Sequence, residues 1–169
     1  MNIKTERLAL VPLDAEALRL LTTDQTAFES RMGVIYDGEP MEGFIRDFFV
    51  STLQQVETAG DRYPLITFWL FHHIELNKYI GSACFKGWPN AQGHSEIGYG
   101  IHTPYEGQGY TTEAVKALIQ WGEAQPEVKQ VIAETEKNNP ASMRIMEKCG
   151  MLRYMETEEA YWWYHPQER

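Results

Sequence analysis

The fold depends on Glu106-Gly107-Gln108-Gly109-Tyr110-Thr111-Thr112, a stretch between a predicted strand (95–101) and a predicted helix (110–124). Glycine has no Cβ atom, so the two glycines allow a tight turn and a close approach of the backbone to a ligand. Free N–H groups at a helix start, with the helix dipole behind them, bind anions. The stretch matches neither the Walker loop nor the dinucleotide pattern GxGxxG. A phosphate site and a plain strand-to-helix connection therefore both remain open.

Downstream of this loop the sequence predicts a strand, a helix and two more strands. The first strand covers 130–135, and the last two lie around Leu152 and Tyr161. Between them, Asn139 is a typical N-cap, Pro140 suits the first helical position and Gly150 ends the helix. These roles explain the helix without giving Ser142 any part in it.

Upstream, helical and strand periods follow one another. A strand at 7–11 ends at Pro12, and apolar stripes predict helices at 14–23, with Asp14 as N-cap, and at 41–58. The connection 33–40 between them has the composition of a mobile or lid-like segment. Strands at 65–71, 79–85 and 95–101 then form an antiparallel meander. The order of elements is that of an α+β, or mixed α/β, domain.

Composition limits the possible functions. A length of 169 residues predicts one domain over 1–169, and 15 basic against 24 acidic residues give a formal net charge of −9. This charge argues against nucleic acid and against an anionic membrane as partners. The longest apolar run, 65–71, is too short to span a bilayer, and the N-terminus has no apolar leader segment. Cys84 and Cys149 form no CxxC pattern and the histidines have no metal-ligand spacing, so we expect a cytoplasmic protein with no metal.

Five segments together resemble the GCN5-related N-acetyltransferase (GNAT) superfamily, and within it the branch of ribosomal-protein N-acetyltransferases. These are the segments 5–13, 80–81, 96–99, 107–114 and 139–151, which contain the Gly-Gln-Gly-Tyr loop, Asn-Pro-Ala-Ser and Glu-Lys-Cys-Gly-Met. The resemblance covers nearly the whole chain. It implies a mixed, mostly antiparallel sheet of about seven strands, splayed between the fourth and fifth, with about four flanking helices.

The resemblance also implies acetyl-CoA as acyl donor. Its pantetheine arm would lie in the splay, and its pyrophosphate on the loop. The residues expected to bind it are Tyr99, Ile101, Gly107, Gln108, Gly109, Tyr110, Thr111, Thr112, Asn139 and Ser142. The loop departs from the family pattern at Glu106, where an acidic side chain disfavours a pyrophosphate, and at Thr111. Asn139 either caps its helix, binds the donor, or does both.

Two residues are expected to carry catalysis. Ser142 matches the serine of the branch's Asn-x-x-Ser segment and would donate a proton to the leaving sulfur. Glu96 matches the catalytic carboxylate of several superfamily members and would act as the base, because an alkyl ammonium must lose a proton before it attacks. The alternative for Glu96 is a solvated carboxylate or an ion pair with a neighbouring Lys or Arg. A backbone N–H near Tyr99 or Gly100 would stabilise the oxyanion.

The acceptor is expected to be an amine-bearing small molecule or a peptide N-terminus. The acidic net charge suits a cationic amine. We expect the acceptor to be bound by the first two helices, the connection 33–40 and the last strands. A homodimer is compatible with the fold. A non-catalytic acyl-CoA-binding module is the alternative function.

Overall fold

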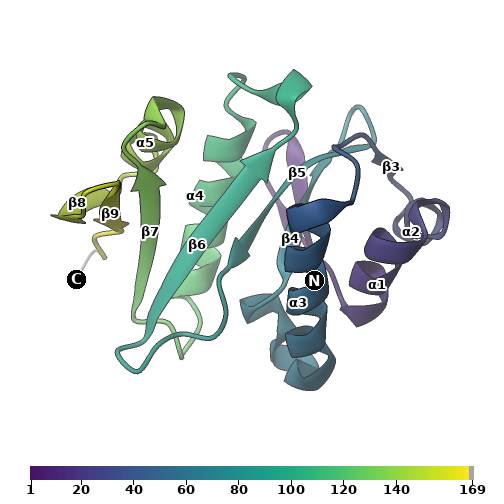
Figure 1. Ribbon diagram of the computed structural model, residues 1–169, viewed down its shortest axis with the longest axis horizontal. Coiled ribbons are helices and arrows are strands. Elements are labelled where there is room, and N and C mark those ends of the chain that lie inside the picture. Colours follow the sequence, from purple (N-terminus) through teal and green to yellow (C-terminus); the bar gives the residue numbers. More distant parts are fainter. Residues whose placement is uncertain (168–169) are drawn as a thin grey trace.

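The computed structural model describes residues 1–167, which contain nine strands and five α-helices (Figure 1). The strands are β1 (Ile3–Lys4), β2 (Leu8–Pro12), β3 (Ile35–Tyr36), β4 (Phe68–His73), β5 (Lys78–Phe85), β6 (His94–Ile101), β7 (Gln130–Glu136), β8 (Leu152–Glu156) and β9 (Ala160–Tyr164). The helices are α1 (Ala15–Thr23), α2 (Gln25–Met32), α3 (Gly43–Ala59), α4 (Tyr110–Glu123) and α5 (Pro140–Lys148). The predicted fold class is confirmed.

Local signals place the helices that matter for the site. The Asp14 carboxylate accepts a hydrogen bond from the backbone N–H of Ala17 at 2.8 Å and so caps α1. The Asn139 amide oxygen caps α5 in the same way, accepting from the N–H of Ser142 at 3.1 Å. The predicted capping roles of both residues are confirmed.

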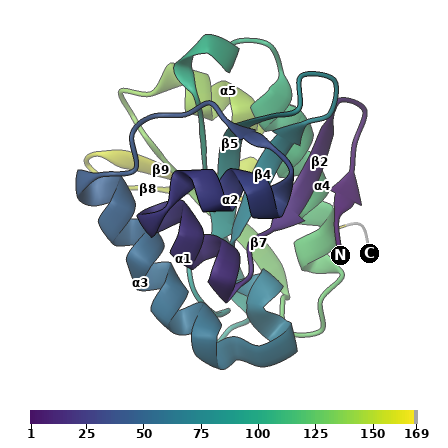
Figure 2. The ribbon, with the colours of Figure 1, turned by 90° about the vertical axis from the view of Figure 1, so that its right-hand side faces the viewer.

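The strands form one sheet in the order β1-β2-β4-β5-β6-β7-β9-β8, with β3 paired to β5. One face is covered by α1, α2 and α3, which pack on one another, and the other by α4 and α5 (Figures 1 and 2). The core lies between these layers, and its largest fully buried side chains include Trp69, Phe71, Phe85 and Trp163.

The sheet is forked between β6 and β7. These two strands run parallel and pair only at His94↔Gln130, Ser95↔Val131 and Glu96↔Ile132. Beyond that point they diverge, and Figure 1 shows the gap widening towards the loop before α4 and the start of α5. The splay expected between the fourth and fifth long strands is therefore present.

The structure adds elements that the sequence pattern did not show. Strands β1 and β3 are two residues long, too short for a period, and α2 buries only Phe28, so it has no apolar stripe. The strand expected at 65–71 begins at Phe68, because Pro64 and Leu65 belong to a 3-10 turn (60–65). No helix within residues 1–167 has the length and apolar character needed to cross a membrane.

The connection 33–40 is not a free lid. Its residues Ile35 and Tyr36 pair with Lys78 and Tyr79 of β5, so the segment belongs to the sheet. The expectation of a lid-like segment is corrected by this pairing.

Candidate active site

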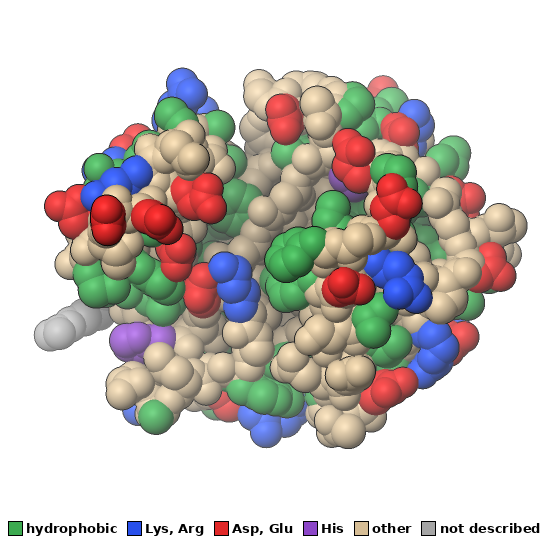
Figure 3. Space-filling model, in the orientation of Figure 1, with side chains coloured by type: hydrophobic (Ala, Val, Ile, Leu, Met, Phe, Trp, Pro, Cys, Tyr) green, Lys and Arg blue, Asp and Glu red, His purple; other side chains and the backbone are tan. Residues whose placement is uncertain are grey.

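Two cavities meet at the fork, on opposite faces of the sheet. Both are lined by Tyr99, Gly100, Ile101 and Ser142. We call the one of about 960 Å³, between the 105–112 loop and α5, the loop cavity, and the one of about 450 Å³, between α3 and β5–β6, the α3 cavity. Figure 3 shows the surface hollowed between the two halves of the sheet.

The loop cavity contains nearly all residues that the sequence assigned to the acyl donor. Its lining includes Tyr99, Ile101, Gly107, Gly109, Tyr110, Thr111, Thr112, Asn139 and Ser142. Gln108 is the exception, since its side-chain amide donates to the carbonyl of Pro104 at 3.1 Å and it does not line the cavity. The acidic Glu106 does line it.

The loop is held open by backbone conformation and by Arg7. Gly107 and Gly109 have φ angles of +71° and +82°, a region that side chains with a Cβ rarely adopt. The guanidinium of Arg7 donates to the carbonyl of Gln108 at 2.9 Å and stacks over the Tyr110 ring at 4.2 Å. The opening segment of the chain therefore braces the loop.

Glu113, in the first turn of α4, ties the same opening segment to the helix. Its carboxylate accepts hydrogen bonds from the Thr5 hydroxyl (2.6 Å), the Arg7 backbone N–H (2.7 Å) and the Arg7 Nε (2.7 Å). Burial alone would raise the pKa of Glu113, but these hydrogen bonds outweigh it and hold the pKa below its ordinary value of 4.5.

Positive charge at the loop cavity comes from two residues that sequence reasoning missed. Arg144 and Lys148 line the cavity from α5, on the same helix face as Ala141 and Ile145. The signal was available, because Arg144 and Lys148 follow Ala141 by three and seven residues, spacings that share one face of a helix.

The fork exposes backbone groups of β6. Lys86 donates its N–H to the carbonyl of Glu96, and His102 donates to that of Ile80, so the even-numbered residues of β6 are bonded to β5. Because these bonds alternate along an antiparallel ladder, the N–H and C=O groups of Tyr99 and Ile101 point towards β7. Since β7 has already diverged there, an extended ligand can pair with them.

A hydroxyl pair marks the junction of the two cavities. The Tyr99 and Ser142 hydroxyl oxygens are 2.6 Å apart. Burial raises the pKa of Tyr99 to about 12, against the opposing effect of this hydrogen bond. The phenol therefore stays protonated at neutral pH and can donate.

Glu96 lies outside both cavities. Its carboxylate accepts from Lys86 Nζ at 2.6 Å, the arrangement that the sequence left open as the alternative to a catalytic base. A different carboxylate, that of Glu134 on β7, lines the α3 cavity. Nothing in the local sequence distinguishes it, because the fork brings it to the site.

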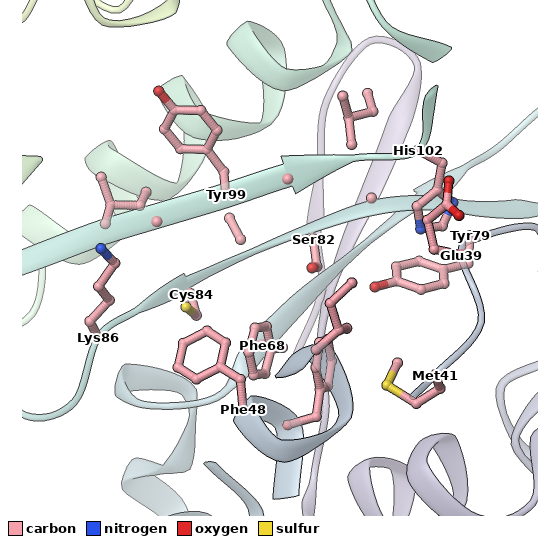
Figure 4. A pocket seen from close by; sticks show the side chains of 18 of the residues that line it. Glu39, Met41, Phe48, Phe68, Tyr79, Ser82, Cys84, Lys86, Tyr99 and His102 are labelled. Atoms are coloured by element: carbon pink, nitrogen blue, oxygen red, sulfur yellow. The ribbon is translucent and has the colours of Figure 1, made fainter. Parts of the chain in front are cut away.

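The α3 cavity is built from side chains of α3, β3–β6 and the segments beside them (Figure 4). Phe48 and Tyr79 face it from opposite sides, and Glu39 lies near His102 at one end. Cys84 also lines it, and burial raises the pKa of its thiol to about 12. Sequence reasoning placed the acceptor near the first helices and the 33–40 connection but named none of these side chains.

The segment around Asp37 is fixed at the rim of the α3 cavity. Its carbonyl accepts a hydrogen bond from His102 Nδ1 at 2.6 Å, and its carboxylate accepts from the Tyr105 hydroxyl (2.6 Å) and Lys78 Nζ (3.1 Å). The Tyr105 hydrogen bond, with that of Lys78, lowers the pKa of Asp37. Burial lowers the pKa of His102, so a neutral ring is favoured.

The part of the chain that the structure describes holds no cluster of three His, Cys, Asp or Glu residues able to bind a metal ion. His73, for example, bonds through Nε2 to the Tyr110 hydroxyl at 3.0 Å.

Known proteins share this sequence pattern and fold. Residues 7–152 match the family described as "Acetyltransferase (GNAT) domain". The "Uncharacterized N-acetyltransferase YjdG" of Bacillus subtilis is 24% identical over 165 residues, which cover 96% of each chain. The ribosomal-protein-S5-alanine acetyltransferase of Vibrio fischeri has a TM-score of 0.71 at 14% identity, over 97% of this chain and 95% of that one. The ribosomal L7/L12 alpha-N-protein acetyltransferase RimL, solved with coenzyme A, has a TM-score of 0.68 at 13% identity, over 98% and 97%.

Proposed function

Because this chain belongs to the GNAT acetyltransferase family and is thus an acyltransferase, we propose that it transfers an acetyl group from acetyl-CoA to a primary amine. The family predicted from the sequence motifs is confirmed by the match over residues 7–152. The observation that carries the finer proposal is the meeting of two cavities at Tyr99 and Ser142. A donor bound on one face and an amine bound on the other would form a ternary complex there.

The loop cavity fits a long donor that carries phosphates at one end and amides along its length. Arg144, Lys148 and the N-terminus of α4 supply positive charge and N–H groups for phosphates. The free C=O group of Tyr99 and the free N–H and C=O groups of Ile101 suit the amides of a pantetheine arm, which would add to β6 as an extra strand. The coenzyme A bound by the structural neighbour RimL supports this assignment.

Acetyl-CoA supplies the acyl group: the amine nitrogen forms a bond to the carbonyl carbon, the C–S bond breaks, and coenzyme A leaves as a thiol. We assign the backbone N–H of Tyr99, which points into the fork, to the carbonyl oxygen as charge develops on it. The Ser142 hydroxyl, bonded to the protonated Tyr99 phenol, donates a proton to the departing sulfur. The amide product keeps one of the two protons of the neutral amine, and the other passes to a base, from which solvent returns it to the Tyr99–Ser142 pair.

Direct attack is favoured because neither thiol is a ready nucleophile. Cys84 lines the α3 cavity but is buried, with a pKa raised to about 12. Burial likewise raises the pKa of Cys149 to about 11. A covalent acyl-cysteine intermediate would require a thiolate at one of these positions.

Two carboxylates are candidates for the base. Glu96 is the one predicted from sequence, but it pairs with Lys86 Nζ at 2.6 Å and lies outside both cavities. Glu134 lies on the wall of the α3 cavity, where an amine would enter. Substituting each by glutamine and comparing the pH dependence of turnover assigns the role to the one whose loss removes the rise of rate with pH.

A thiol-release assay with a panel of primary amines tests the function, alongside calorimetric titration with acetyl-CoA. We expect acetyl-CoA to bind and at least one amine to accelerate thiol release, with an acetylated amine as product by mass spectrometry. Binding without acceleration by any amine would instead indicate an acyl-CoA-binding module. Failure of acetyl-CoA to bind would contradict the proposal at its first step.

A further inference from the structure

The α3 cavity is rich in aromatic side chains. Seven of its lining residues carry phenyl or phenol rings, namely Tyr36, Phe44, Phe48, Phe49, Phe68, Tyr79 and Tyr99. They support one another: Phe48 meets Phe68 edge-on at 5.2 Å between ring centres, and Phe49 stacks on Phe68 at 3.8 Å. The volume of about 450 Å³ is that of a site for one small organic molecule.

The rim of this cavity leaves large apolar side chains in water. On α3, Phe44 is 84% exposed, Ile45 46% and Phe48 40%. Figure 3 shows hydrophobic side chains of this region bordering the hollow. Exposed apolar groups that border a cavity indicate a ligand surface. They also offer no hydrogen bonds, so the amide groups of a bound peptide would lose water here without replacement.

The charges at this cavity are acidic and unpaired. Glu39 and Glu134 both line it, and within residues 1–167 neither forms an ion pair. Among the lining residues that the structure describes, the one Lys or Arg is Lys86, and Glu96 pairs with it at 2.6 Å. The site therefore attracts a positively charged molecule.

Glu39 is held in place by the residues before it. Asp37 is fixed by hydrogen bonds from His102, Tyr105 and Lys78, and the Tyr36 hydroxyl donates to the backbone carbonyl of Glu39. Figure 4 shows the Glu39 carboxylate beside the His102 ring at the end of the cavity. A carboxylate on a braced segment selects an ammonium by position as well as by charge.

We propose that the acceptor is a small arylalkylamine, whose aromatic group packs against the rings of Phe48 and Tyr79 and whose ammonium is drawn in by Glu39 and Glu134. This inference rests on the proposed acetyl transfer and names the acceptor class of the same site. The junction at Tyr99 and Ser142 is open to the cavity, so an amine on a short alkyl chain reaches it while its ring stays among the aromatic side chains. Polyamines lack the apolar group, and peptides bring amides that the α3 rim does not satisfy.

The experiment compares amines by steady-state thiol release with acetyl-CoA saturating. The amines are phenethylamine, tryptamine, n-butylamine, spermidine and a tetrapeptide with N-terminal alanine. We expect kcat/KM for phenethylamine to exceed that for n-butylamine by about tenfold or more, the factor that one well-buried ring of binding energy supplies. Phe48→Ala should remove most of that preference, and Leu152→Ala, at another half-exposed position outside both cavities, should leave it.

A second pair of variants tests the charge. Glu39→Gln should raise KM for phenethylamine several-fold with little change in kcat, while Glu42→Gln, nearby but outside the cavity, should change neither. Preference for spermidine or the peptide, or an equal effect of Phe48→Ala on phenethylamine and n-butylamine, overturns the acceptor class and leaves the acetyl transfer standing. If none of the amines in the panel accelerates thiol release, both the acceptor class and the acetyl transfer are overturned. Acetyl-CoA binding then shows which part is wrong: binding means that the reaction is wrong, and no binding means that the donor is wrong. Thermal unfolding of each variant verifies that it folds.

Discussion

The loop cavity and the α3 cavity share four residues but are made in different ways. The loop cavity owes its shape to backbone: two glycines with positive φ, the N-terminus of α4 and the unpaired edge of β6. The α3 cavity owes its shape to side chains that come from segments far apart in the chain, such as Glu39, Phe48 and Glu134. A site made of backbone tolerates many side chains, whereas a site made of side chains changes with each one. With the roles proposed above, the first can keep one donor while the second varies its acceptor.

The largest effect is expected where the two cavities join. Ser142→Ala should lower kcat by about 100-fold, the usual contribution of a positioned proton donor. The dissociation constant of acetyl-CoA should change little, because the loop and its backbone groups stay in place. Steady-state thiol release measures kcat, and calorimetric titration measures the dissociation constant of acetyl-CoA.

Ser30→Ala, at an exposed position of α2 outside both cavities, is the matched control for Ser142→Ala. It should change neither kcat nor affinity. Equal losses of kcat and of acetyl-CoA affinity in Ser142→Ala would make Ser142 a binding residue instead.

A substitution in the 105–112 loop is expected to weaken acetyl-CoA binding about tenfold and to leave amine binding in the α3 cavity unchanged. Gly109→Ala forces a side chain into a φ of +82°, at a cost of about 1–2 kcal/mol, which corresponds to about tenfold in acetyl-CoA affinity if the loop relaxes to relieve it. The KM of the amine should stay the same. Gly87→Ala is the control, because Gly87 has a φ of +79° and open space around it but lies outside both cavities. If both variants weaken acetyl-CoA binding, the loop is not the donor site.

The smallest effect concerns the brace behind the loop. Glu113→Gln should lower the free energy of unfolding by about 1 kcal/mol at pH 7, a modest value because Arg7 is 37% exposed and water screens the pair. The folded-state pKa of Glu113 lies below 4.5, so its contribution is complete above that pH and is lost as the pH falls through the folded-state pKa. The difference in unfolding free energy between wild type and Glu113→Gln, measured by urea unfolding, should thus shrink as the pH falls below 4.5.

Glu6→Gln is the control for this pH dependence. Glu6 is exposed and forms no hydrogen bond or ion pair in the part of the chain that the structure describes. If the difference in unfolding free energy between wild type and Glu113→Gln stayed constant down to acid pH, the stability lost at position 113 would come from packing and not from charge.

The same contrast explains what could be predicted from sequence. The glycine loop and the cap at Asn139 were predicted because neighbouring residues encode them, whereas Ser142 was singled out only by the family resemblance. The Tyr99–Ser142 pair joins positions 43 apart, so it requires the position of α5 relative to β6. The α3 cavity requires more, since Glu39 is placed by a parallel two-residue strand and Glu134 by the fork. Neither feature leaves a periodic pattern, and so no local signal identified them.

The fork also affects how the protein avoids aggregation through an exposed strand edge. An unpaired strand edge is a template on which another chain can add, and proteins usually protect such edges with charges, bulges or short strands. Here the free edge of β6 beyond Glu96 is recessed between the halves of one sheet, with the 105–112 loop and α5 at its mouth. A thin, flexible molecule can enter, whereas a strand that belongs to another folded sheet is kept out by the walls. The opening that admits a ligand is thereby closed to aggregation.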